Sequence, residues 1–211
     1  MSFFLSRRNF LGGAALLALS PLLARAADAA PVVTKLARPQ AKESPDKIEV
    51  IEFFSYGCNH CNDFHPILKA WIARQQPDVV VRRIPVAWNR SWENLARLYY
   101  TLESLGDLTR LDDAVFNALH KERRELFSER SLLRWYVEQG GNGEKFAATF
   151  KSFGVMSKVR QAEQKRAAMS VEGVPTLIVE GQYHIEGDFT RMLQAADQLI
   201  AQARKTLPRK K

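Results

Sequence analysis

Hydrophobic positions along the chain fall into two periodic patterns, and the first of them predicts β-strands. Short segments that are rich in β-branched and aromatic residues have the composition of strands inside a protein. Four such segments are present: Lys47–Ser55, Val79–Val86, Val174–Glu180 and Tyr183–Glu186. The first two are expected to be buried, and Gly181 is expected to join the last two as a hairpin.

The second pattern repeats at the spacing of an amphipathic helix. Apolar residues between Phe64 and Ile72 predict a helix directly after the first strand. Several further stripes predict a block of helices from about Ser91 to Met169, and a last amphipathic helix is predicted over Thr190–Lys205. Residues 27–47 are rich in alanine, proline and charge, and they are expected to form a mobile leader into the fold.

The order of these elements predicts how the chain is organised. It reads β-α-β, then a helical block, then β-β-α. A parallel β-α-β unit followed by a hairpin and a helix forms one small sheet, into which the helical block is inserted. We therefore expect an α/β fold in three parts: residues 27–88 and 169–211 form the sheet domain, and residues 89–168 form an all-helical insertion.

Residues 1–26 have the organisation of an export signal. Two arginines precede an apolar stretch, Phe10–Ala24, whose 15 residues fall short of the roughly 20 that a membrane-spanning helix needs. That length disfavours the alternative of an uncleaved anchor. Small residues predict cleavage near Ala26, and the run Ser6–Leu11 resembles a twin-arginine signal more than a general secretory one. The predicted destination is the periplasm, an oxidising compartment.

Composition and charge exclude several other classes of protein. The chain has 211 residues, of which 46% are hydrophobic and 26% charged, so disordered, collagen-like and low-complexity proteins are excluded. The formal charge is +8, but without residues 1–26 it falls to +5, from 28 basic and 23 acidic residues. Part of that excess lies in the tail, Lys205–Lys211, where no aromatic–basic motif accompanies it. We therefore expect a solvated terminus and no nucleic-acid partner.

The only two cysteines lie together in Cys58-Asn59-His60-Cys61. Where a strand ends at Gly57 and a helix begins at Cys58, exposed backbone N–H groups and the helix dipole favour an anion, which lowers the pKa of a thiol. His60 adds a donor or a positive charge. Because a stabilised thiolate makes the disulfide more oxidising, we predict a redox-active pair. Cys58 would be the attacked sulfur, and Cys61, which lies deeper, the resolving one.

Other uses of two cysteines are less favourable. A structural disulfide between them would close a very short loop and constrain the unfolded chain little. A c-type haem motif needs histidine directly after the second cysteine, where this chain has Asn62. Metal binding is the main alternative, because Cys58, His60, Cys61 and His65 could supply four ligands. Three neighbours on one helical turn make a cramped tetrahedral site, so we favour redox chemistry and assign no metal.

Two motifs carry a resemblance to a known family. The run EFFSYGCNHC, from Glu52 to Cys61, and the later run Gly173–Thr176 (GVPT) resemble the DsbA family of periplasmic thiol:disulfide interchange proteins. The likeness covers the chain after residue 26 and implies a thioredoxin fold with an inserted all-helical domain. One departure concerns the dipeptide between the cysteines, which tunes the redox potential. Many relatives carry Pro-His there, while this chain has Asn59-His60.

The resemblance also implies roles for residues outside the cysteine pair. Pro175 matches a cis-proline that faces the cysteines, rather than an ordinary trans turn residue, and it leaves the backbone of Val174 open to an extended substrate peptide. Glu52 matches a buried acid that accepts a proton from Cys61. Its apolar neighbours favour burial over the alternative of a solvated strand residue. Arg83 falls near a lysine that partners this acid. The remaining histidines belong to no motif and are expected to be structural or solvated: His65, His120 and His184.

The function implied is a thiol:disulfide oxidoreductase that introduces disulfide bonds into exported, unfolded proteins. A substrate thiolate attacks Cys58, and a second substrate thiol then resolves the mixed disulfide. A DsbB-type, quinone-linked membrane oxidase would regenerate the pair, the protein would act as a monomer, and no diffusible cofactor is needed. Two alternatives stay open: a disulfide isomerase or reductase, and a periplasmic metal-binding carrier.

Overall fold

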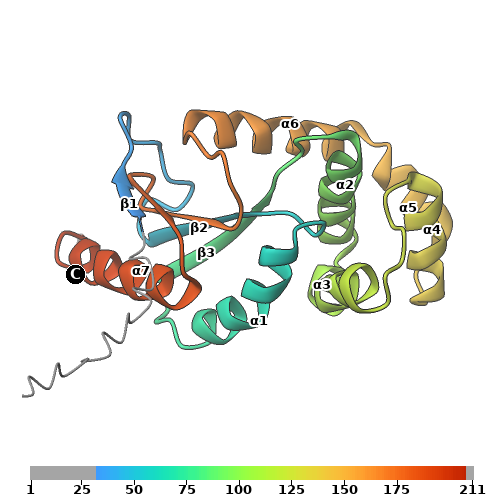
Figure 1. Ribbon diagram of the computed structural model, residues 1–211. Helices are drawn as coiled ribbons and strands as arrows, with labels where there is room; N and C mark the ends of the chain where they lie inside the picture. The colour runs from blue at the N-terminus through green and yellow to red at the C-terminus, as the bar shows by residue number, and fades with distance from the viewer. Residues whose placement is uncertain (1–31, 208–211) are drawn as a thin grey trace, which may run out of the picture.

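A mixed five-stranded sheet forms the centre of the molecule, with helices on both of its faces (Figure 1). The computed structural model describes residues 32–207, so the predicted export signal, residues 1–26, lies outside the described residues. The strands are β1 (Val32–Lys35), β2 (Ile48–Phe54), β3 (Val79–Pro85), β4 (Thr176–Val179) and β5 (Tyr183–Glu186). Their order in the sheet is β1-β5-β4-β2-β3, and β2 and β3 are the parallel pair.

Strand β2 lies between β3 and β4, and all seven of its residues are buried. Neighbouring residues of a strand point to opposite faces of the sheet, so a strand covered on both faces consists almost wholly of apolar residues. Glu52 is an exception in this strand. It pairs in register with Arg83 of β3 on one side and with Leu177 of β4 on the other. The register thus places a charged partner beside a buried acid.

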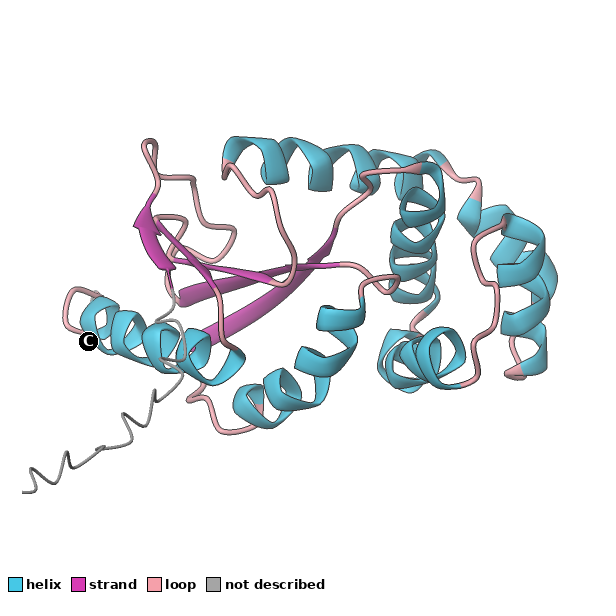
Figure 2. Ribbon diagram, in the orientation of Figure 1, coloured by secondary structure: helices cyan, strands magenta, loops and turns pink. Residues whose placement is uncertain are grey.

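Helices surround the sheet in two groups, as Figure 2 shows. Their bounds are α1 (Asn59–Ile72), α2 (Arg90–Leu105), α3 (Leu108–Phe116), the π-helical turn η1 (Asn117–Lys121), α4 (Glu129–Glu138), α5 (Gly143–Phe150), α6 (Phe153–Ala168) and α7 (Phe189–Arg204). Helices α1 and α7 cover one face of the sheet, while α2 to α5 form a separate block beyond its end and α6 returns from that block to the sheet. All helices of the block lie between β3 and β4 in the sequence.

Two hydrophobic cores hold these layers together. One lies between α1, α7 and a sheet face, and there the rings of Phe64 and Phe189 are 5.0 Å apart. The other extends from the opposite face into the helical block and contains Phe53, Cys58 and Cys61. The cysteines therefore lie in the core that joins the sheet to the inserted helices.

The fold class predicted from the sequence, an α/β thioredoxin fold with an inserted all-helical domain, is confirmed. Two local expectations were wrong. Residues 32–35 are not part of a mobile leader, because they form β1 and pair antiparallel with β5. Strand β3 was expected to be buried, but its residues from Val79 to Arg83 are only half-buried, because β3 is the edge strand of the sheet. Within residues 32–207, no helix is both long and apolar enough to cross a membrane.

Candidate active site

The cysteine pair begins helix α1 at the end of the central strand. Cys58 is the N-cap residue, and its backbone N–H donates to the carbonyl of Ser55 over 3.1 Å. Gly57 precedes it at a position with no space for a side chain, because a Cβ atom there would lie 2.9 Å from the indole nitrogen of Trp92. The chain passes from β2 to α1 through residues 55–58, which leaves the sulfur of Cys58 at the helix N-terminus. Unpaired N–H groups stabilise a negative charge at that position.

The two thiols have opposite acidities. Both cysteines are free thiols, and the backbone N–H of Cys61 donates to the sulfur of Cys58 over 3.4 Å. A hydrogen bond from the Cys61 thiol, helped by the backbone N–H groups of Cys61 and His60 and by the charge of His60, lowers the pKa of Cys58 to about 6. Burial and the interaction with Cys58 raise the pKa of Cys61 far above that of a free thiol. Near neutral pH, the thiolate is therefore Cys58.

Residues far along the chain complete the surroundings of Cys58. Its sulfur lies 3.5 Å from the carbonyl oxygen of Val174, to which the protonated thiol donates. The Val174–Pro175 peptide bond is cis, and the hydroxyl of Thr176 donates to the carbonyl of Gly173 over 2.8 Å. The structure thus brings Val174 and Pro175 to Cys58. Predicted residue His60 is exposed on the first turn of α1.

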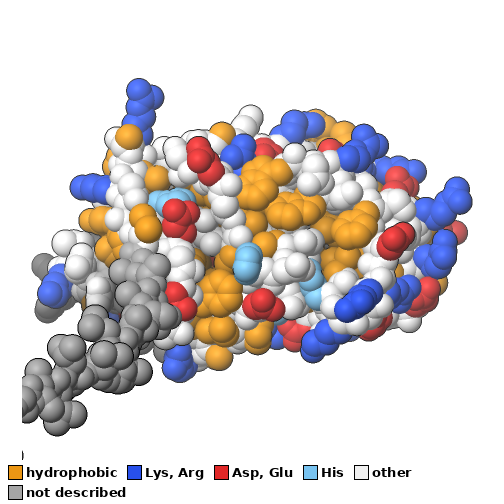
Figure 3. Space-filling view, viewed as in Figure 1, with side chains coloured by type: hydrophobic (Ala, Val, Ile, Leu, Met, Phe, Trp, Pro, Cys, Tyr) orange, Lys and Arg blue, Asp and Glu red, His pale blue; other side chains and the backbone are white. Residues whose placement is uncertain are grey.

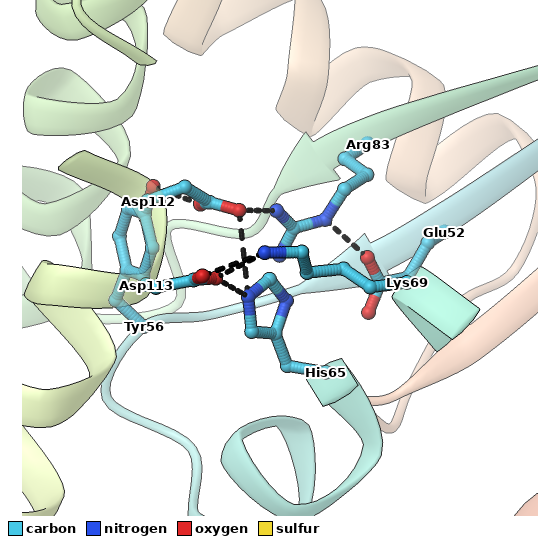
Figure 4. A network of polar contacts seen from close by, with 7 residues as sticks. All are labelled: Glu52, Tyr56, His65, Lys69, Arg83, Asp112 and Asp113. Atoms are coloured by element: carbon cyan, nitrogen blue, oxygen red, sulfur yellow. Dashed lines mark hydrogen bonds and ion pairs between the residues drawn. The ribbon is translucent and has the colours of Figure 1, made fainter. Parts of the chain in front are cut away.

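A buried chain of charges runs from β2 to the helical block (Figure 4). Arg83 donates through Nε to Glu52 and through Nη1 to Asp112 of α3, each over 2.6 Å. The hydroxyl of Tyr56 donates to the other carboxylate oxygen of Asp112, also over 2.6 Å. The Arg83 guanidinium also lies over the ring of Phe54, 4.0 Å from its centroid. One arginine therefore balances two carboxylates at the boundary between the sheet and the inserted helices.

Burial sets the protonation of this chain. Glu52 is fully buried, and the loss of solvent raises its pKa despite the opposing effect of Arg83. Burial also raises the pKa of Tyr56 well above its ordinary value. Although burial alone would lower the pKa of Arg83, the negative charges of Glu52 and Asp112 outweigh it and raise that pKa. Arg83 therefore stays charged, and Glu52 binds a proton more readily than an exposed carboxylate does.

Two histidines from the group without a motif lie beside the site. His120 of η1 contacts the carbonyl oxygen of Tyr56 through Nε2 at 2.7 Å and the Asn59 side chain through Nδ1 at 3.1 Å. His65 of α1 is buried, and its Nε2 lies 2.7 Å from Asp113 of α3. Sequence reasoning missed these contacts, because they join residues about 50 to 60 positions apart and no spacing indicates them. His184 lies on β5, away from the cysteines.

The alternative metal site does not assemble in this arrangement. His60 is exposed, while His65 is directed at Asp113, so these two rings do not converge on the cysteine sulfurs. Among residues 32–207, the single group of metal-binding side chains close enough to share an ion is His65, Asp112 and Asp113. Lys69 already donates to both oxygens of Asp113, over 2.6 and 2.8 Å. The ammonium group of Lys69 therefore already occupies the outer side of this group.

An apolar surface adjoins the cysteine loop. A shallow cleft of about 450 Å³ is lined by Gly57, Trp92 and Phe127 among other residues. Trp88 stacks on Trp92 with ring centroids 5.3 Å apart, and Trp88 and Phe127 are each about 40% exposed. Figure 3 shows hydrophobic side chains gathered across the middle of the face in view, with charged side chains mostly around its rim. Exposed apolar patches of this kind bind other apolar groups.

A dithiol at the start of a helix, with one stabilised thiolate and a cis-proline loop beside it, defines a thiol:disulfide oxidoreductase of the thioredoxin fold. Residues 49–199 match the family described as the DSBA-like thioredoxin domain. The chain belongs to that family, and the resemblance drawn from its sequence is confirmed.

Relatives and solved structures agree with this assignment. The chain is 37% identical to the thiol:disulfide interchange protein DsbA of Bordetella parapertussis, over 91% of this chain and 95% of that one. For DsbA of Pseudomonas aeruginosa, the identity is 33% over 90% and 94%. The crystal structure of Pseudomonas aeruginosa DsbA covers 82% of this chain and 92% of its own at 33% identity, with a TM-score of 0.78. That of Xylella fastidiosa DsbA covers 82% and 96% at 31% identity, with a TM-score of 0.77.

Proposed function

We propose that this oxidoreductase works as an oxidase, which donates its Cys58–Cys61 disulfide to exported, unfolded proteins. The observation that carries the proposal is the difference in acidity between the two thiols. A pKa of about 6 at Cys58 stabilises the reduced protein, because the thiolate exists at neutral pH without cost. Stabilising the reduced form raises the reduction potential by roughly 30 mV for each 1.4 kcal/mol. Electrons then flow from the substrate to the protein.

The reaction proceeds in two exchanges. A substrate thiolate attacks the sulfur of Cys58, the bond between the two cysteines breaks, and Cys61 leaves. Because Cys61 is buried and its pKa is raised, it takes up a proton as it leaves. A second substrate thiolate then attacks the substrate sulfur of the mixed disulfide. Cys58 leaves as a thiolate, and the substrate keeps the new disulfide.

Glu52 is proposed to exchange that proton with Cys61. The pKa of Glu52 is raised by burial, so the carboxyl can hold a proton, and its charge acts on the pKa of Cys61. In the forward direction Glu52 gives the proton to Cys61. When the disulfide is restored, the same carboxylate accepts it. His60 is proposed to add to the stabilisation of the Cys58 thiolate, as its charge lowers that pKa.

Substrate is proposed to bind beside the sulfur through backbone and apolar contacts. The carbonyl of Val174, next to Pro175, lies 3.5 Å from the Cys58 sulfur, where an extended peptide could pair with it as an added strand. The apolar surface at Trp92 and Phe127 would hold hydrophobic side chains, which an unfolded protein exposes and a folded one buries. This combination selects for unfolded chains without reading a particular sequence.

The remaining assignments follow from the export signal and the family. We propose that residues 1–26 direct the chain to the periplasm and are removed near Ala26. Residues 27–88 and 169–211 would then form the thioredoxin-like domain, and residues 89–168 the helical insertion. The protein would act as a monomer, and a DsbB-type, quinone-linked membrane oxidase would restore the disulfide.

Equilibration with glutathione buffers, followed by oxidative refolding of a reduced substrate, tests the proposal. We expect a reduction potential well above the roughly −270 mV of thioredoxin, and disulfide formation in the substrate by the oxidised protein. A potential near that of thioredoxin would contradict the oxidase. Faster repair of a scrambled substrate than oxidation of a reduced one would favour the isomerase. Stoichiometric zinc or copper in the purified protein would favour a metal carrier.

A further inference from the structure

Three buried polar atoms beneath the cysteines have no hydrogen-bond partner among residues 32–207. They are Oε1 of Glu52, Nδ1 of His65 and Nη2 of Arg83, and they come from β2, α1 and β3. Buried polar atoms in proteins are nearly always hydrogen-bonded, to protein or to ordered water. A buried water molecule ordinarily bridges two to four such atoms. Three atoms of this kind around one acid therefore suit a shared water molecule.

His65 connects this buried place with the surface. In Figure 4 its ring lies between the carboxylate of Glu52 and the two aspartates of α3, with Nε2 toward the aspartates. Nε2 is 2.7 Å from Asp113, whose side chain is 56% exposed, whereas Nδ1 is buried. The His65 ring packs against Phe116, with centroids 4.6 Å apart, which holds its orientation. An imidazole can accept a proton at one nitrogen and release it from the other.

The other neighbours of Glu52 offer no such route. Arg83 remains protonated, since its pKa is raised by the carboxylates on either side. Tyr56 also keeps its proton, because burial raises its pKa well above the ordinary value. Asp112 is separated from Glu52 by Arg83, which donates to both. His65, in contrast, lines an open cleft of about 600 Å³ between α1 and α3.

We propose that His65 carries protons between Glu52 and the solvent of this cleft, and that it thereby sets how fast Cys61 gains or loses its proton. This inference rests on the proposed role of Glu52. When the disulfide is restored, the Cys61 thiol gives its proton to the Glu52 carboxylate, and the Cys61 sulfur attacks the mixed disulfide. Glu52 then passes the proton through the bridging water to Nδ1 of His65, and Nε2 releases one proton toward Asp113. One proton leaves the protein, and no further oxidant or reductant takes part.

Charged groups of several elements face His65. They are Glu52 of β2, Arg83 of β3, Lys69 of α1, Asp112 and Asp113 of α3, and, at the rim of the same cleft, Asp63 of α1 and Lys121 of η1. The two nearest are Asp112 and Asp113, whose carboxylate oxygens lie 3.6 and 2.7 Å from Nε2. His65 acts through Glu52 and touches neither cysteine, so it is a positioning residue.

The closure of a mixed disulfide isolates the step in question. Glutathione disulfide reacts first with the Cys58 thiolate, and Cys61 then loses its proton and displaces glutathione. In H65Q we expect closure at least about tenfold slower at neutral pH, as for loss of general acid–base assistance, with the first step unchanged within about twofold. Acid quenching and mass spectrometry measure both steps. Unchanged closure in H65Q would overturn the proposal.

The double variant E52Q/H65Q shows whether His65 acts through Glu52. If it does, closure in E52Q/H65Q is no slower than in E52Q alone, because the route is already broken. If H65Q slows closure by the same factor in the E52Q protein as in the unmodified protein, the proposal is overturned. A low reduction potential would contradict the oxidase, but it would leave this comparison of rates intact.

A chemical rescue separates proton transfer from a structural effect. H65A enlarges the cleft between α1 and α3, and added imidazole is expected to restore closure in proportion to its concentration. A purely structural role predicts no rescue, and that result would overturn the proposal. H184Q is the matched control, because His184 also has a buried ring nitrogen without a partner in the described part of the chain but lies on β5, with β4 between it and β2. We expect H184Q to close at the normal rate.

Discussion

In the reduced protein, the backbone N–H of Cys61 points at the sulfur of Cys58 and donates to it over 3.4 Å. Cys61, which attacks the mixed disulfide when the pair is oxidised again, thus stabilises Cys58 as an anion. Burial, in turn, keeps Cys61 protonated. The pair is therefore divided into one thiolate and one thiol before any substrate arrives.

The first prediction concerns which groups lower the pKa of Cys58. Ultraviolet absorbance of the thiolate should give a pKa of about 6. C61A should raise it most, because the hydrogen bond from the Cys61 thiol is the largest stabilising contribution. H60A should raise it by less than about one unit, which corresponds to less than roughly 30 mV in potential. A larger rise in H60A than in C61A would contradict this order.

A second prediction follows for the stability of the reduced protein. The pKa of Cys58 is about 6 in the folded state and about 8.5 in an unfolded chain, so the unfolded state binds more protons between these values. Stability from Cys58 is complete above about pH 8.5, declines as the pH falls, and is absent below about 6. The pKa of Cys61 is raised in the folded state, so its contribution is lost as the pH rises above about 8.5.

Urea unfolding of the reduced and the oxidised protein across this pH range checks the sign. We expect the unfolding free energy of the reduced protein, relative to that of the oxidised protein, to be highest at about pH 8.5. The oxidised form serves as the reference because it has neither thiol to titrate. C61A should lose the decline above about pH 8.5, and its rise at lower pH should be smaller, because the variant also raises the Cys58 pKa. A flat difference across this range would be inconsistent with a depressed Cys58 pKa.

Much of the fold follows from periodicity, because burial imposes it on the sequence. The hairpin partner Tyr183–Glu186 has the predicted bounds, and the last helix, Phe189–Arg204, differs from its prediction by one residue at each end. Strand β1 could not be found in this way. Its four residues are all exposed, so no alternation marks them, and the antiparallel pairing with β5 supplies the partner that the local sequence lacks.

The residues of the site also fall into two groups, those that the sequence identifies and those that it does not. Cys58 and Cys61 are found from the sequence because their chemistry needs a fixed local spacing. Asp112 and His120 are not, because they reach the site through the packing of α3 and η1 against the β2–α1 turn. Those contacts depend on how the inserted helices are oriented, which no local pattern of residues encodes.

A third prediction tests the charge at the boundary between the two parts of the fold. R83M leaves Glu52 and Asp112 buried without their shared cation, and removing one partner of a buried ion pair costs about 3–5 kcal/mol. Urea unfolding near neutral pH should show this loss. The difference from the unmodified protein should shrink as the pH falls, because protonated carboxyls no longer need the arginine.

Two variants control this measurement. R74M changes an exposed arginine, and its unfolding free energy should stay within about 0.5 kcal/mol of the unmodified protein. R83K keeps the charge but not the fork that donates to two carboxylates, so it should fall between the unmodified protein and R83M. A loss below about 1 kcal/mol in R83M would show that the buried charges are balanced in another way.

The fourth prediction concerns the apolar surface beside the cysteines. If unfolded proteins bind there, F127S should lower kcat/KM for a reduced, unfolded protein by about three- to tenfold, the value of one apolar contact of about 1 kcal/mol. Reaction with dithiothreitol should be unchanged, since a small dithiol needs no such surface. Asn94 donates to the backbone carbonyl of Phe127, a bond that the substitution keeps.

The control for F127S is F153S, because Phe153 is the more exposed of the two rings, at 76% against 42%, but begins α6 and does not line the cleft beside Gly57. General loss of surface hydrophobicity would slow both variants alike, whereas a docking surface slows only F127S. Equal rates for the two variants on the unfolded protein would place substrate binding elsewhere. The position of the apolar surface, and not its hydrophobicity alone, then decides whether an unfolded chain reaches the Cys58 sulfur.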